Sequence, residues 1–85
     1  MPRYYFDLRD EDGLTTDLDG LVLVDIHAAR EEAARTLSDL ARDEIRRRMR
    51  HQSNNHIMAI DVRDDDGPLV EVKFAITIIN KRLIR

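Results

Sequence analysis

A single long amphipathic stretch in the middle of the chain constrains its fold more than any other feature. Between Ile26 and Met49, apolar residues recur at steps of three and four, a spacing that places them on one stripe of an α-helix. Asp25 stands directly before this stretch, where a carboxylate can accept the backbone amides left without partners in the first helical turn. The sequence therefore predicts one helix from Ile26, ended by the polar segment HQSNNH at residues 51–56.

The segments on either side of the helix alternate between apolar and polar residues, which is the period of a β-strand. Residues 3–9 predict a first strand and residues 21–24 a second, and a start of the second strand as early as Leu14 stays open. Residues 57–63 predict a third strand and residues 69–79 a fourth. The side chains expected to face inward are Tyr4, Phe6, Leu8, Met58, Ile60, Val62, Val70, Val72, Phe74 and Ile76.

The predicted fold class is α+β, with the order β-β-α-β-β and one long helix packed on one face of a small antiparallel sheet. We expect residues 1–85 to form a single α+β domain. A chain of 85 residues buries only a modest core, and the absence of cysteine excludes disulfides as a support. Oligomerisation is the remaining support, so we expect a homodimer, formed through the outer sheet face or a strand edge.

A short repeat links the two halves of the chain. FDLRDEDGL begins at Phe6 and IDVRDDDGPL begins at Ile60, and both contain three consecutive acids followed by glycine. Two such loops could bind a divalent cation, but neither has the spacing or the closing glutamate of a calcium-binding EF-hand loop. Tight turns at two hairpin tips are the simpler interpretation. On that interpretation Asp7, Asp61, Arg9 and Arg63 lie on the solvent face and are candidates for cross-strand ion pairs.

Arginines cluster near the end of the predicted helix. We identify Arg46, Arg47 and Arg50 as candidates for contact with an anion or a partner, since arginine binds phosphate in a bidentate manner. A solvated helix end is the alternative. The formal net charge of −3 and the lack of nearby aromatic residues argue against nucleic acid as the partner.

Histidine occurs at positions 27, 51 and 56. His51 and His56 are five positions apart in the polar segment, which is no recognised ligand spacing. We expect exposed polar side chains there, and a metal site that joins them to an aspartate is the alternative.

No catalytic constellation stands out. Ser38 and Ser53 do not lie in a nucleophile elbow, and there is no glycine-rich phosphate loop. We therefore expect no enzyme activity and no cofactor or metal. The chain also has no signal peptide and no apolar run of membrane-spanning length, so we expect a cytoplasmic protein without membrane contact.

Four motifs carry a resemblance to a known family over nearly the whole chain. They are MPRYYFDLRDEDG at the start, DLDG at 17–20, DIHAAREEA at 25–33 and DVRDDDGPLVEVKF at 61–74. In this order they resemble a family of short uncharacterised alphaproteobacterial proteins, a domain of unknown function, whose members open with MPRYYF. The resemblance implies no activity, substrate or site residue. The function we expect is a non-catalytic interaction or accessory module that acts as a homodimer.

The alternative function rests on a weaker resemblance to antitoxins of the HicB type. Those proteins also begin with a strand, an Asp/Gly turn, a short strand and a helix rich in alanine and glutamate. This chain lacks their PDLPGC-like signature. The resemblance would imply a regulator that binds a protein partner and touches nucleic acid through Arg46, Arg47 and Arg50.

Overall fold

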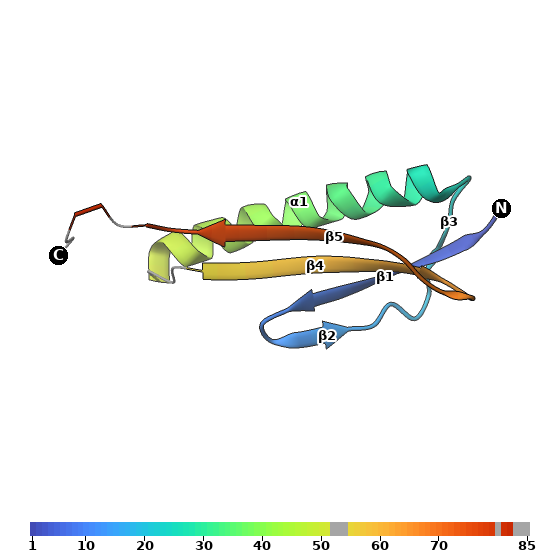
Figure 1. Ribbon diagram of the computed structural model, residues 1–85, viewed down its shortest axis with the longest axis horizontal. Coiled ribbons are helices and arrows are strands. Elements are labelled where there is room, and N and C mark those ends of the chain that lie inside the picture. The colour runs from blue at the N-terminus through green and yellow to red at the C-terminus, as the bar shows by residue number, and fades with distance from the viewer. Residues whose placement is uncertain (52–54, 80, 83–85) are drawn as a thin grey trace.

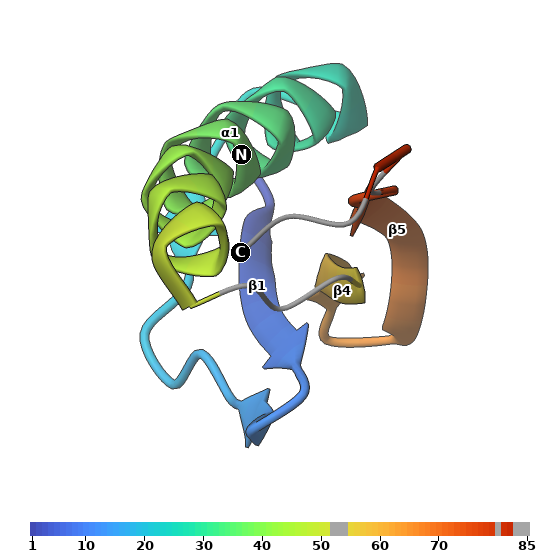
Figure 2. The ribbon, with the colours of Figure 1, turned by 90° about the vertical axis from the view of Figure 1, so that its left-hand side faces the viewer.

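The structure, a computed structural model, describes residues 1–51, 55–79 and 81–82. In chain order its elements are β1 (Arg3–Asp10), β2 (Gly13–Thr15), β3 (Leu21–Val22), α1 (Ile26–His51), β4 (Asn55–Asp64) and β5 (Gly67–Thr77). The helix α1 runs along β4 and β5 and covers one face of the sheet (Figures 1 and 2). The predicted α+β class, with one long helix on one face of an antiparallel sheet, is confirmed.

The sheet joins the two halves of the chain side by side. Its strands follow the order β2-β1-β4-β5, and β3 pairs with the start of β1. The central pairing is antiparallel and sets Tyr5 opposite Arg63, Asp7 opposite Asp61 and Arg9 opposite Ala59. In the described part of the chain β5 pairs with β4 alone, so β5 is an edge strand.

The prediction of a single second strand is wrong in its detail, because the chain after the first turn forms two short strands, β2 and β3. Both β2 and β3 pair with β1, and residues 16–20 leave the sheet between them. The carboxylate of Asp17 takes the place of a neighbouring strand there. Its Oδ2 accepts the Phe6 N–H at 3.1 Å, while the Asp17 N–H donates to Oδ1 of Asp7 at 2.8 Å. The excursion therefore satisfies one backbone amide of β1, that of Phe6, which a continuous strand could otherwise bond.

The surroundings of Asp17 stabilise the ionised form of its carboxylate. Burial raises the pKa of its carboxyl, but hydrogen bonds from the backbone amides of Gly20, Phe6 and Asp19, together with the nearby charge of Arg63, act in the opposite direction. The pKa of Asp17 is as a result lower than its ordinary value of 3.8. The ionised carboxylate thus contributes to folding stability at neutral pH.

The repeated acidic segments form hairpin turns, as predicted. The last pair before each tip joins Asp10 to Gly13 in the first hairpin and Asp64 to Gly67 in the second. The leading aspartate accepts the amide two residues on, at 2.8 Å in the first turn and 2.9 Å in the second. Both closing glycines have positive φ, of 126° and 131°, which residues with a Cβ rarely adopt.

The core lies between α1 and the sheet. Asp25 caps the helix as predicted, with its Oδ1 accepting the Ala28 N–H at 2.9 Å. The helix presents small residues to the sheet, which lets it pack closely over β4. The buried cluster consists of Tyr4, Ala29, Ala33, Leu37, Met58, Ile60 and Val62. No helix in the described residues has a stretch both long and apolar enough to cross a membrane.

One helix covers β5 incompletely. The inward side chains Val70, Val72 and Phe74 pack against the core but are only half-buried. On the opposite face Ile57 and Leu69 are exposed. The apolar surface of the edge strand is therefore only partly removed from water.

We expect the substitution Asp17→Asn to destabilise the fold, because its amide nitrogen cannot accept the Phe6 N–H. The cost of leaving that amide without an acceptor is about 1–3 kcal/mol. Since the pKa of Asp17 is depressed, its contribution is present above pH 3.8 and is lost as the pH falls through the lower folded value. Thermal unfolding measured from pH 7 downwards should show the difference from the unmodified chain shrinking below that pH.

The exposed Asp19 provides the control for this measurement. The substitution Asp19→Asn should leave the melting temperature nearly unchanged, because the hydrogen bonds of Asp19 to other described residues use its backbone and not its carboxylate. A loss of stability in Asp17→Asn that stays constant to the lowest pH would contradict the role of the charge.

Candidate functional site

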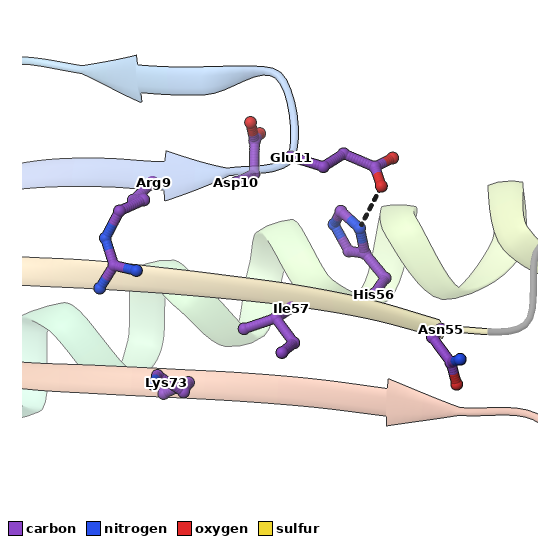
Figure 3. Close-up of a pocket in the computed structure, with 7 residues that line it drawn as sticks. All are labelled: Arg9, Asp10, Glu11, Asn55, His56, Ile57 and Lys73. Atoms are coloured by element: carbon purple, nitrogen blue, oxygen red, sulfur yellow. Dashed lines mark ion pairs between the residues drawn. The ribbon is translucent and has the colours of Figure 1, made fainter.

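A cluster of three ionisable side chains lies where the first hairpin tip meets the end of the helix. His56 Nδ1 lies 3.5 Å from Glu11 Oε2, and His56 Nε2 lies 3.5 Å from Glu44 Oε1. One ligand atom from each residue lies within 4.8 Å of the others. Figure 3 shows the Glu11 side chain reaching from the hairpin toward the imidazole of His56. We call these three residues the Glu–His–Glu cluster.

The cluster is buried on one side and open on the other. The side chains of His56 and Glu44 are only 2% and 9% exposed, whereas that of Glu11 is 51% exposed. A surface pocket reaches the cluster from the solvent side, and its lining includes Asp10, Glu11, Asn55 and His56 (Figure 3). The pocket thus opens beside His56, whose imidazole is itself almost fully covered.

The prediction that His56 is an exposed loop residue is wrong. His56 belongs to β4 and is buried. It lies on the same face as Met58, Ile60 and Val62, because inward side chains alternate along a strand. Extending that alternation two residues toward the N-terminus would have placed His56 inward. No sequence pattern marked Glu11 or Glu44, because their proximity to His56 depends on how the first hairpin and the helix pack together.

The three arginines predicted to contact an anion or a partner, Arg46, Arg47 and Arg50, have different surroundings. Arg47 donates to both carboxylate oxygens of Glu44, at 2.9 and 2.7 Å. This bond and the charge of Glu44 raise the pKa of Arg47, and the charges of Asp12 and Asp10 raise it further. Arg46 is exposed, and the side chain of Arg50 lies outside the described residues. Arg47 thus interacts with acidic residues of its own chain.

A second group of charges crosses the sheet on the face opposite the helix. Arg63 Nε lies 2.8 Å from Asp7 Oδ2, and Arg9 Nε lies 3.2 Å from Asp61 Oδ2. The predicted cross-strand ion pairs are confirmed, and each runs diagonally rather than straight across. Arg63 also stacks over the Tyr5 ring at 4.4 Å. These pairs raise the pKa values of both arginines through hydrogen bonds and charge.

The network continues onto β5. Arg9 Nη2 lies 2.7 Å from Glu71 Oε2, and Lys73 Nζ lies 3.1 Å from Glu71 Oε1. Charges of alternating sign therefore extend from β1 across β4 to the free edge. Lys73 is the last member in the described part of the chain, and it is exposed at that edge.

We expect Arg63→Gln to lower the melting temperature more than Arg9→Gln. The side chain of Asp7, the partner of Arg63, is 12% exposed, whereas that of Asp61, the partner of Arg9, is 36% exposed. Arg63→Gln therefore leaves the more deeply buried of the two carboxylates without its counter-charge. The two arginines occupy equivalent positions of the repeat, which makes each the control for the other. Equal shifts in calorimetric unfolding would contradict this ranking.

The comparisons with known proteins agree with one part of the resemblance seen in the sequence, membership of a family of unknown function. No curated protein and no solved structure matches the chain. A family model described as Domain of unknown function (DUF6894) matches residues 3–75, which is most of the chain. The protein therefore belongs to the DUF6894 family.

Proposed function

We propose that this domain is a non-catalytic interaction module that acts as a homodimer, with β5 as the shared edge. The observation that carries the proposal is the outer edge of the 11-residue strand β5, which pairs with no other strand among residues 1–51, 55–79 and 81–82. An edge strand presents a row of backbone N–H and C=O groups that can pair with another strand. A second copy of the same strand satisfies these groups through a two-fold axis.

The half-covered side chains of β5 supply a driving force. Val70, Val72 and Phe74 keep part of their apolar surface exposed beside the helix. A second protomer continues the sheet past this edge and brings its own helix to the same face. Burial of that remaining surface stabilises the dimer at about 25 cal/mol per Å². For a domain of this size, such a contribution is a substantial part of the total stability.

Charge complementarity selects the register. An antiparallel pairing centred on Val72 sets Glu71 of one protomer opposite Lys73 of the other, and the reciprocal pair follows by symmetry. Opposite charges that face each other across strands stabilise the pairing. The same register sets Val70 opposite Phe74 on the helix face. The charge network on the open face then runs without interruption from one protomer to the other.

Lys73 also restricts which strands can pair with this edge. A lysine in the middle of an edge strand opposes pairing with an apolar strand, and Pro68 removes a backbone donor near its start. Pairing centred on Val72 gives Lys73 an acidic partner. The edge is thus suited to a second copy more than to an arbitrary strand.

The non-catalytic part of the proposal rests on the sequence. There is no cysteine, and Ser38 donates its hydroxyl to the Ala34 carbonyl within the helix at 2.8 Å. That bond is a local helix contact and gives the serine no general base.

Cysteine substitution tests the register directly, because the natural chain contains no cysteine. Residues directly opposite in an antiparallel pair have Cα atoms about 4.5–5.5 Å apart, within the range that a disulfide bridges. Under mild oxidation we expect Val72→Cys to form a covalent dimer, resolved by non-reducing electrophoresis. Val70→Cys is the matched control and should remain monomeric on the gel, because position 70 faces position 74 of the other copy. Equal cross-linking of the two variants, or none in Val72→Cys, would contradict the register.

Charge exchange tests the same interface without covalent bonds. Glu71→Lys and Lys73→Glu each place like charges opposite each other twice, so we expect both variants to be monomers by light scattering. Mixing them restores opposite charges at both positions and should give a heterodimer. Asp43→Lys, on an exposed position of the helix, is the control and should stay dimeric. A strictly monomeric unmodified chain at micromolar concentration would overturn the proposal.

A further inference from the structure

We propose that the Glu–His–Glu cluster binds a divalent transition-metal ion of the zinc class. It offers one imidazole nitrogen and two carboxylate oxygens, and all three are ligand types that zinc accepts. The donors already lie within 4.8 Å of one another. This inference is independent of the proposed dimer, since none of the three residues lies on β5.

The three donors come from different parts of the chain. Glu11 is at the tip of the first hairpin, Glu44 is in the last part of α1, and His56 is near the start of β4. The site therefore exists only in the folded domain, and an ion bound there would link the first hairpin to the helix and the sheet. Such a link would stabilise the folded state, because the unfolded chain presents no assembled site.

One side chain must move before the three donors can share an ion. Zinc ligands lie about 2.0–2.2 Å from the metal, which places tetrahedral ligands about 3.3 Å from one another. The two carboxylates face different nitrogens of the His56 ring, because Glu11 Oε2 lies 3.5 Å from Nδ1 and Glu44 Oε1 lies 3.5 Å from Nε2. An ion on Nε2 would therefore have Glu44 close by, and Glu11 would have to move round the ring to reach it. Glu11 is half exposed at a hairpin tip, so its side chain can rotate to bring the third donor closer. His56 and Glu44 are held by the surrounding core and helix.

Neighbouring charges support the site. Arg47 holds Glu44 in place through two hydrogen bonds, the kind of outer contact that orients a ligating carboxylate. Asp10 and Asp12 lie close enough to influence Arg47. Four carboxylates lie near Arg47 and His56, whereas the two cations that also line the pocket, Arg9 and Lys73, are paired with Asp61 and Glu71. Among the described residues around the cluster, negative charge is therefore in excess and attracts a cation.

The pocket shown in Figure 3 opens beside Glu11 and His56, on the side from which an ion and water would enter. Three protein ligands with a solvent-accessible side leave a fourth position of a tetrahedral ion to water. The acidic hairpin tip alone does not provide this arrangement. The second tip also has three consecutive acids, but it has no histidine partner among the described residues.

The test is calorimetric titration of the metal-free full chain with Zn²⁺ at neutral pH, together with visible absorption of the Co²⁺-loaded protein. We expect one ion per chain and the absorption of a four-coordinate cobalt site. Glu11→Gln should weaken zinc binding by at least about tenfold, the lower bound seen when even an outer contact of a metal site is lost. Because Glu11 is at an exposed turn, this variant should remain folded. His56→Gln should abolish the cobalt absorption.

Two matched controls separate the site from general surface binding. Asp65 occupies the position of Glu11 in the second hairpin, so Asp65→Asn should bind zinc as the unmodified chain does. His27 is exposed on the helix, and His27→Gln should also leave binding unchanged. Absence of heat at millimolar Zn²⁺ would overturn the proposal. So would a Glu11→Gln variant with undiminished affinity, or equal weakening in Asp65→Asn.

Discussion

The pairing of β1 with β4 holds the two hairpins together, and an unfavourable contact stands at its centre. Asp7 lies directly opposite Asp61, and like charges in that position destabilise a sheet. The arginines two residues further along each strand compensate by reaching diagonally, Arg63 to Asp7 and Arg9 to Asp61. Four charges of alternating sign result. Everything else in the domain depends on this pairing, because β4 carries β5 and the centre of the core.

This arrangement explains the repeat in the sequence. The same Asp-x-Arg spacing on two antiparallel strands produces a local two-fold relation around the Asp7–Asp61 pair. Each strand supplies the arginine that the other strand's aspartate requires. The acidic tips repeat for a separate reason, since each turn uses an aspartate to bind the amide two residues on. The two tips differ in their surroundings, because Glu11 of the first tip lies beside His56, whereas the equivalent Asp65 has no histidine beside it among the described residues.

Most features that depend on local periodicity were predicted from the sequence. The helix, its Asp25 cap, the inward face of each long strand and both aspartate–glycine turns follow from residue spacing. Cross-strand ion pairs were also expected, because Asp7, Asp61, Arg9 and Arg63 lie on the outer face of predicted strands, but their diagonal course was not. The two hairpins' position side by side did not follow, since pairing between distant strands depends on tertiary packing.

The errors have particular physical causes. The second strand divides because Asp17 bonds the Phe6 amide, a contact between residues 11 positions apart that periodicity does not encode. His56 was assigned to a polar loop on the basis of its neighbours, although its parity matches Met58 and Ile60. The Glu–His–Glu cluster joins three segments that are distant in the sequence, so no residue spacing could have predicted it.

The length of α1 has a consequence for how the domain folds. A helix of 26 residues is about 39 Å long, and a strand of 10 residues is about 33 Å long. The helix thus carries the chain back along the whole sheet before β4 begins. Arg9 and Asp61 are 52 positions apart, so joining β1 to β4 closes a long loop, which is slow when the loop is flexible. A helix formed early shortens that search, and we expect substitutions that weaken α1 to slow folding as well as to reduce stability.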